Sequence, residues 1–105
     1  MKDEMTKGNI DVPGPLNLID GNWVPAASGK EMDVLSPIDG QPFARIADSD
    51  AADIDAAVIA ARAAFETGEW GRLTAAERGR LMNRLSLAIL DNAEALAHLE
   101  TRDNG

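Results

Sequence analysis

The sequence predicts an α/β fold in which two β-hairpins are followed by two α-helices. Short apolar segments flank a tight turn of the Asp-Gly kind near Gly21 and a second turn at Ser36–Gly40, which indicates the two hairpins. Apolar residues then recur at helical spacing through residues 50–67 and 74–104. An isolated two-stranded hairpin is only marginally stable, so we expect both hairpins to need a surface to pack on.

The first hairpin is predicted to pair residues 16–20 with residues 23–26 across a turn at Gly21-Asn22. Pro25 has no backbone N–H, so the second strand should lie at an edge or end early. The second hairpin is predicted to pair residues 32–35 with residues 41–47. Its turn carries proline at a turn-initiating place and an Asp-Gly pair that favours positive φ.

The chain is predicted to divide into a disordered arm, residues 1–15, and a single segment, residues 16–105. The arm mixes charges with glycine and proline and has no hydrophobic periodicity. Its first residues lack the apolar core of a secretory signal, and no apolar run in the sequence approaches the length of a membrane span. We therefore expect a cytoplasmic protein.

The first helix is predicted over residues 50–67, with Ser49 or Asp50 as its N-cap and Gly68 just past its end. Acidic side chains crowd its first turn, where they complement the helix dipole. This explains Asp53 and Asp55 without assigning them acid/base chemistry. One face of the helix is apolar and carries Ile54, Val58, Ala61 and Phe65.

The second helix is predicted as one long amphipathic element from Thr74 to Asn104. Thr74 and Glu77 form a capping box at its start. Its apolar stripe consists of Leu81, Met82, Leu85, Ala88, Ile89, Leu96 and Leu99. Leu87 and Leu90 project away from this stripe, so the helix is expected to need burial on two sides.

Composition removes several classes of function. The chain has no cysteine, which excludes disulfides, thiolate metal ligands and a cysteine nucleophile. Its net charge of −8 opposes binding to nucleic acid or to an anionic membrane surface. His98 is the single histidine and follows Glu94 by four residues on the polar helix face, so we interpret it as part of an (i, i+4) pair.

The order and spacing of several short motifs resemble the N-terminal segment of aldehyde dehydrogenases. These motifs are Ile19–Val24, Ala27–Lys30, Ser36–Gly40, Asp53–Phe65, Ala75–Leu81 and Glu100–Gly105. The resemblance implies that residues 16–105 are the N-terminal part of a Rossmann-type cofactor-binding domain that is incomplete here. It also implies an association with the oxidation of an aldehyde to a carboxylic acid by NAD or NADP.

The same resemblance implies that this chain is a truncated, structural and non-catalytic portion of such an enzyme. Members of the family use a cysteine nucleophile, a glutamate base and a nucleotide site, and this chain lacks all three. Gly68, Gly71 and Gly79 do not follow a predicted strand and make no dinucleotide-binding motif. We therefore expect no catalytic residues, no cofactor-binding residues and no cofactor in this chain.

One ligand site follows from the resemblance alone. In several members, the matching aspartate and two main-chain carbonyls hold a monovalent cation, which here implies Val34, Leu35 and Asp103. Carboxylate and carbonyl oxygens suit a hard cation. The alternative is that Asp103 terminates the helix and accepts hydrogen bonds from nearby N–H groups.

Two hypotheses for the partner remain. In the first, the chain packs on the remainder of an aldehyde dehydrogenase. In the second, it is a stand-alone interaction module that docks on a full-length dehydrogenase, or on itself, through Leu87 and Leu90. Neither hypothesis involves nucleic acid or a membrane.

Overall fold

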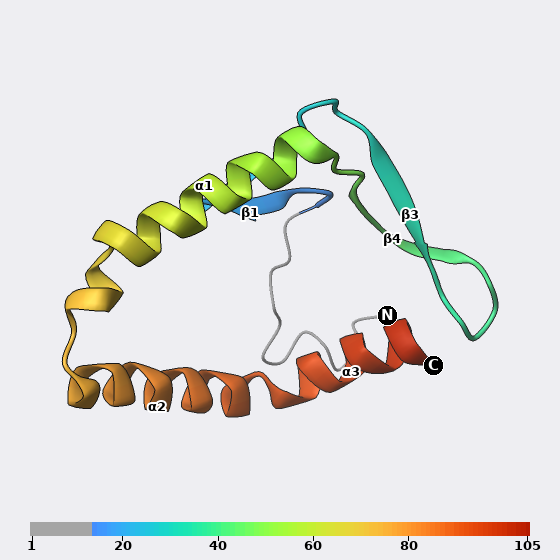
Figure 1. Cartoon of the computed structure of the whole chain (residues 1–105). Helices are drawn as coiled ribbons and strands as arrows, with labels where there is room; N and C mark the ends of the chain where they lie inside the picture. Colours follow the sequence, from blue (N-terminus) through green and yellow to red (C-terminus); the bar gives the residue numbers. More distant parts are fainter. Residues whose placement is uncertain (1–13) are drawn as a thin grey trace. The chain divides into compact units, whose positions relative to one another are not determined.

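Figure 1 shows the computed structural model, which describes residues 14–105 as two small β-sheets followed by three α-helices. The described residues fall into two compact units. The hairpin–α1 unit comprises residues 14–34 and 42–73, and the α2–α3 unit comprises residues 35–41 and 74–105. Residues 1–13 of the predicted arm lie outside the described part of the chain.

The first hairpin is confirmed, with its turn one residue earlier than predicted. Strands β1 (Asn17–Ile19) and β2 (Asn22–Val24) are antiparallel, and Leu18 is opposite Trp23. Asp20 has a φ of 51° and Gly21 a φ of 73°, so both central residues are left-handed, as a type I′ turn requires. The Asn22 side chain donates a hydrogen bond to the Asp20 carbonyl (3.1 Å) and supports the turn.

The second hairpin is also confirmed and consists of β3 (Glu31–Leu35) and β4 (Pro42–Ala47). Its turn is closed by the Gly40 N–H, which donates to the Ser36 carbonyl (2.8 Å), and by the Ser36 N–H, which donates to the Gln41 carbonyl (2.8 Å). Gly40 has a φ of 71°, a left-handed conformation that costs glycine little. The Asp-Gly sequence therefore placed this turn correctly.

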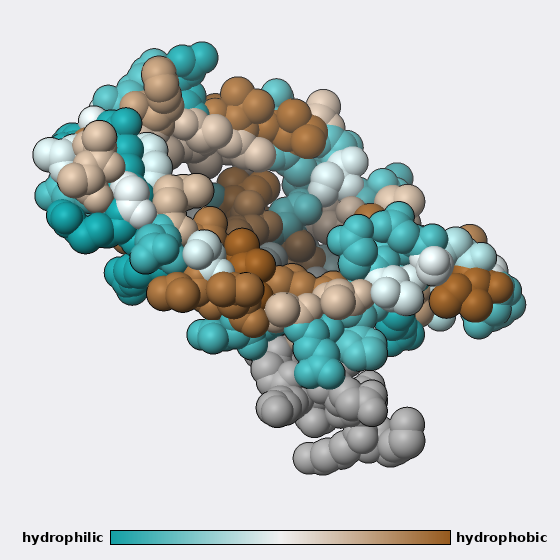
Figure 2. Space-filling view, turned by 90° about the horizontal axis from the view of Figure 1, so that it is seen from below, coloured by the Kyte–Doolittle hydropathy of each residue, from teal (hydrophilic) through white to brown (hydrophobic). Residues whose placement is uncertain are grey.

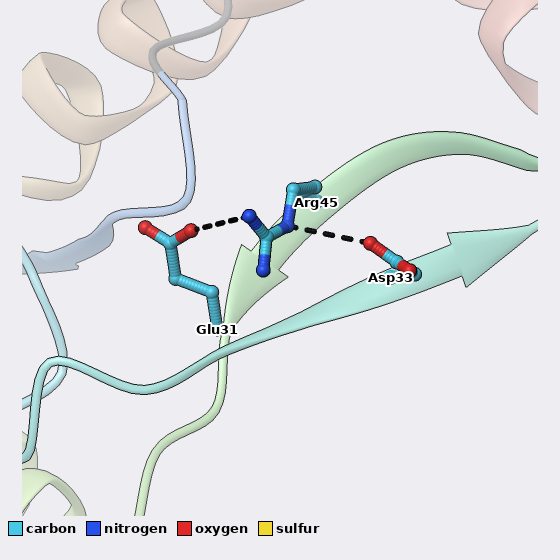
Figure 3. A network of polar contacts seen from close by, with 3 residues as sticks. All are labelled: Glu31, Asp33 and Arg45. Atoms are coloured by element: carbon cyan, nitrogen blue, oxygen red, sulfur yellow. Dashed lines mark ion pairs between the residues drawn. The ribbon is translucent and has the colours of Figure 1, made fainter.

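Charged side chains join the two strands of the second hairpin (Figure 3). Arg45 of β4 lies between two acids of β3, with its Nη1 3.1 Å from Glu31 Oε1 and its Nε 3.3 Å from Asp33 Oδ1. Glu31 and Asp33 are two residues apart and so lie on the same face of the strand. All three side chains are solvent-accessible, so each ion pair contributes at most about 1 kcal/mol.

Helix α1 (Ala51–Thr67) begins where the sequence indicated, with Asp50 rather than Ser49 as the N-cap. The Asp50 carboxylate accepts a hydrogen bond from the Ala52 N–H (3.1 Å), and the Asp53 carboxylate accepts one from the Asp50 N–H (3.0 Å), which makes a reciprocal capping box. After α1 the chain makes one short 3₁₀ turn, η2 (Glu69–Arg72).

Gly68 ends α1 for a different reason than the sequence suggested. A helix-terminating glycine commonly has positive φ. Gly68 instead has an extended backbone, with φ −72° and ψ 161°. A Cβ atom at this position would overlap the backbone carbonyl oxygen of Ala64. The site therefore needs glycine for its lack of a side chain and not for its left-handed conformation.

The single long helix predicted for Thr74–Asn104 is wrong: the structure has two helices, α2 (Ala75–Asp91) and α3 (Ala93–Asn104). Asn92 separates them with φ −110° and ψ 14°. Its side-chain amide donates to the Ala88 carbonyl (2.9 Å), and its backbone N–H also reaches that oxygen (3.2 Å). Asparagine side chains compete with the helix backbone for hydrogen bonds in this way, which explains the interruption.

Candidate functional site

Apolar side chains without cover are the main feature of the described surface. Among residues 14–105, Ala26 and Ala95 are the only buried apolar residues, and neither brings a large side chain. The exposed large apolar side chains of the helices are Ile54, Val58, Ile59, Phe65, Leu81, Met82, Leu85, Leu87, Ile89, Leu90 and Leu96. So many exposed apolar side chains indicate an interaction surface.

Helix α2 carries the largest part of this surface. The predicted capping box fixes its start, because the Thr74 N–H donates to Glu77 Oε2 (2.7 Å) and the Glu77 N–H donates to Thr74 Oγ1 (3.2 Å). Figure 2 shows brown apolar side chains gathered over the face of α2 that it views, with teal hydrophilic side chains beside them. Leu87 is 53% exposed and Leu90 is 69% exposed. We define these two leucines as the α2 pair.

Helix α1 presents a second apolar face, within the hairpin–α1 unit. Val58, Ala61, Arg62 and Phe65 line a shallow hollow on its surface. Phe65 is the most exposed large apolar side chain of the described residues, at 77%. Arg62 pairs weakly with Glu66 one turn on, with 3.9 Å between Nη1 and Oε1. The apolar stripe predicted for this helix is therefore uncovered.

The predicted cation ligands lie at the end of one strand and the end of one helix. Val34 and Leu35 are the last two residues of β3, and Asp103 lies in the last turn of α3. Within the α2–α3 unit, the end of α3 lies against the turn that follows β3, since a Cβ on Gly105 would be 3.4 Å from Pro37 Cγ. The cation site implied by the resemblance stays a prediction.

The end of α3 does not use Asp103 as its cap. Gly105 closes the helix with a φ of 93°, and its N–H donates to the Thr101 carbonyl (2.7 Å). The Asn104 side chain donates to Glu100 Oε1 (3.0 Å). The Asp103 carboxylate is exposed and lies at the negative end of the helix dipole, where a second negative charge is unfavourable.

Replacing Asp103 with asparagine should therefore stabilise the last turn of α3 by about 0.3 to 1 kcal/mol. Backbone amide hydrogen exchange in tetramethylammonium chloride measures this gain without a small cation. In sodium or potassium chloride of equal ionic strength, a cation held by Asp103 would slow exchange in the wild-type chain and not in the variant. Identical wild-type rates in all three salts would contradict cation binding by this chain.

The other polar residues singled out in the sequence lie on exposed surface. His98 lies in α3 and lines a shallow depression with Glu94, Ala97 and Thr101. Asp55 is exposed in the first part of α1. No helix in residues 14–105 is both long enough and apolar enough to cross a membrane.

Asp53 has a role that the sequence did not reveal. It is 6% exposed, and its Oδ1 accepts a hydrogen bond from the Ala27 N–H (2.8 Å), 26 residues away in the chain. The Asp50 N–H, and after it the Ala27 N–H, lower the pKa of the Asp53 carboxyl from its ordinary value of 3.8. The spacing of Asp50 and Asp53 signals the local capping box, but nothing local signals the contact with Ala27.

The fold defines a class of α/β protein segment, in which paired hairpins are followed by helices with exposed apolar faces. Comparison with known proteins places it more closely. The aldehyde dehydrogenase family profile matches residues 23–105, and the chain belongs to this family.

The human mitochondrial 10-formyltetrahydrofolate dehydrogenase is 46% identical over 87 residues, which are 83% of this chain and 9% of that protein. The crystal structure of a putative aldehyde dehydrogenase from Burkholderia cenocepacia is 50% identical, with a TM-score of 0.79, over 84% of this chain and 18% of that one. The Staphylococcus aureus betaine aldehyde dehydrogenase in complex with NAD+ is 36% identical, with a TM-score of 0.82, over 86% of this chain and 18% of that one.

The chain thus spans less than a quarter of the length of each of these relatives. The described elements have the aldehyde dehydrogenase fold of these structural neighbours. The resemblance seen in the sequence motifs is therefore confirmed at the level of family and fold.

Proposed function

We propose that this chain is the N-terminal structural segment of an aldehyde dehydrogenase and braces its Rossmann-type cofactor-binding domain without catalysing a reaction itself. The observation that carries the proposal is the uncovered apolar surface of α1 and α2. Burial of a leucine or isoleucine side chain is worth about 1.5 to 3 kcal/mol, so these faces supply substantial free energy once covered. The family membership supports the remainder of a dehydrogenase as the cover.

The reaction of the whole enzyme is proposed to be the NAD- or NADP-dependent oxidation of an aldehyde to a carboxylic acid. The residues of this chain do not fit the nucleotide. A phosphate-binding glycine motif follows a strand. Gly68 follows a helix, Gly71 lies in η2 and Gly79 lies inside α2, so none of the three meets this requirement. The sequence also offers no cysteine nucleophile. The chain's contribution is therefore shape and buried apolar area.

A chimera tests this proposal. The Burkholderia cenocepacia protein, with its matching segment replaced by residues 16–105 of this chain, should fold and reduce NAD+ or NADP+ with an aldehyde. Because half of the replaced residues are identical, we expect its kcat/KM to stay within about tenfold of the unmodified enzyme. NADH or NADPH absorbance measures the rate. The free chain, assayed alone, should show no rate above background.

Two results would contradict the proposal. An insoluble chimera, alongside a soluble unmodified enzyme, would mean that this chain does not fit the domain. A rate from the free chain that saturates with aldehyde would mean that the segment is catalytic.

The second candidate is a stand-alone interaction module, and the exposure of the α2 pair favours it. This module would dock on an intact dehydrogenase or on itself. Sedimentation of the purified chain, alone and with the intact Burkholderia cenocepacia enzyme, separates the two candidates. If the chain sediments as a monomer and does not bind the added enzyme, the interaction-module hypothesis is contradicted. Co-sedimentation with the enzyme at a stoichiometric ratio would support it.

A further inference from the structure

The start of α1 is where separate segments of the hairpin–α1 unit are tied together by polar groups. Asn17 of β1 donates a side-chain hydrogen bond to Ser49 Oγ (2.8 Å). The Asp48 N–H donates to the Lys30 carbonyl just before β3 (2.9 Å). Both hairpins are therefore joined by hydrogen bonds to the residues that lead into α1.

Asp53 makes the third of these connections, to the linker between the hairpins, residues 25–30. One carboxylate oxygen accepts the Ala27 N–H of the linker (2.8 Å), and the other accepts the Asp50 N–H of the helix start (3.0 Å). Asp53 is buried as a residue, at 6% exposed, and the neighbouring Ala26 is buried as well, at 3% exposed. Among the described residues, no other acidic side chain is buried.

We propose that Asp53 is a positioning residue that latches the hairpin linker to α1, so that a polar contact holds the hairpins where an apolar core would ordinarily do so. In the described part of this unit, Ala26 is the single buried apolar residue, and its side chain is one methyl group. Hydrophobic burial there is worth about 0.8 kcal/mol per CH₂-sized group, which is too little to fix two hairpins. The hydrogen bonds of the carboxylate supply the missing specificity.

A carboxylate suits this position better than an amide. The site offers two N–H donors, and an ionised carboxylate has an acceptor oxygen for each of them. In an asparagine, one oxygen is replaced by an NH₂ group, which would place a side-chain donor against one of the two backbone N–H donors. The charged groups carried by the adjoining segments are Lys30, Asp48, Asp50 and Asp55, and the Asp50 carboxylate is already engaged by the Ala52 N–H.

The hydrogen bonds that Asp53 accepts from Ala27 and Asp50 should be lost in acid. Its two N–H donors lower the pKa of Asp53 in the folded state. The stabilisation is therefore fully present above the ordinary pKa of 3.8, which applies in the unfolded chain, and it is lost as the pH falls through the lower folded-state pKa.

Amide NMR on the full chain tests the proposal with Asp53→Asn and a matched control, Asp55→Asn. Each substitution removes one negative charge, and the two positions are two residues apart in the first part of α1. We expect Asp53→Asn to accelerate hydrogen exchange at the Ala27 amide at least tenfold and Asp55→Asn to change it less than threefold. Amides in the middle of α1, such as those of Ala60 and Ala63, should be unaffected by either.

A pH titration of the wild-type chain provides a second measurement that needs no variant. The Ala27 and Asp50 amide shifts should move together with one midpoint below the ordinary pKa value of 3.8. The proposal is overturned if Ala27 exchange is unchanged in Asp53→Asn, or if the middle of α1 accelerates as much as Ala27, since Asp53 would then stabilise the helix generally. Separate midpoints for the two amides would also overturn it.

Discussion

Replacing Leu87 and Leu90 together with glutamine should leave the free chain unchanged but destabilise the chimera. Both leucines are more than half exposed in the chain, so the substitution removes little buried area there, and glutamine is as good a helix former as leucine. In the chimera, we expect the pair to be covered by the rest of the dehydrogenase. Loss of two buried leucines costs about 3 to 6 kcal/mol, a hundredfold or more in the folded-to-unfolded ratio.

Two measurements separate these effects. Far-UV circular dichroism of the free chain should give the same helix content with and without the substitutions. After equilibration in urea, the dehydrogenase activity of the substituted chimera should be lost at a clearly lower urea concentration than that of the chimera with Leu87 and Leu90 intact. The matched control is Arg80→Gln with Arg84→Gln on the same helix, which changes two exposed polar positions. Equal sensitivity to urea for both double variants would show that Leu87 and Leu90 face solvent in the assembled enzyme.

Gly68→Ala should destabilise the junction between α1 and η2, at a cost in folding free energy of more than about 1 kcal/mol. The new methyl group would overlap the Ala64 carbonyl oxygen, which belongs to the helix backbone and cannot move aside as a flexible side chain would. The Gly68 N–H donates to this same oxygen (3.0 Å), so relief of the overlap weakens that hydrogen bond. Amide exchange at residue 68 should accelerate about fivefold or more.

Gly79→Ala is the matched control and should have the opposite sign. Gly79 lies inside α2, and a Cβ atom there would meet no atom within 4 Å. Alanine in a helix interior is about 1 kcal/mol more favourable than glycine, so exchange in α2 should slow. If both substitutions stabilise their helices, the chain leaves α1 by another path than the one seen here.

Much of the local structure follows from short sequence signals. The Thr74 and Glu77 capping box and the Asp39-Gly40 turn occur where their residues predict, because each depends on neighbours within a few positions. The family and fold also follow from ordered motifs in the sequence, and comparison confirms them. Leu87 and Leu90 are exposed, and so are Met82, Leu85 and Ile89 of the predicted stripe, so exposure alone does not separate the two sets.

The helix break at Asn92 lay beyond sequence reasoning. Hydrophobic periodicity continues across this residue, and asparagine is tolerated in helices with its side chain in solvent. Only the folded chain shows the side-chain amide on the Ala88 carbonyl, where it competes with the backbone and ends α2. The periodic pattern therefore gave the wrong number of helices.

By itself, the sequence determined the family, the two hairpins, the starts of α1 and α2 and the absence of a cysteine nucleophile, since each rests on residue identity or on contacts between near neighbours. The local path of the folded backbone decided that Gly68 is required by its contact with Ala64, and the tertiary structure decided that Asp53 holds Ala27. Both depend on atoms brought together by the path of the chain, and in the case of Asp53 that path joins residues 26 positions apart. A one-dimensional pattern records which side chains are available, but it does not record which backbone groups will meet them.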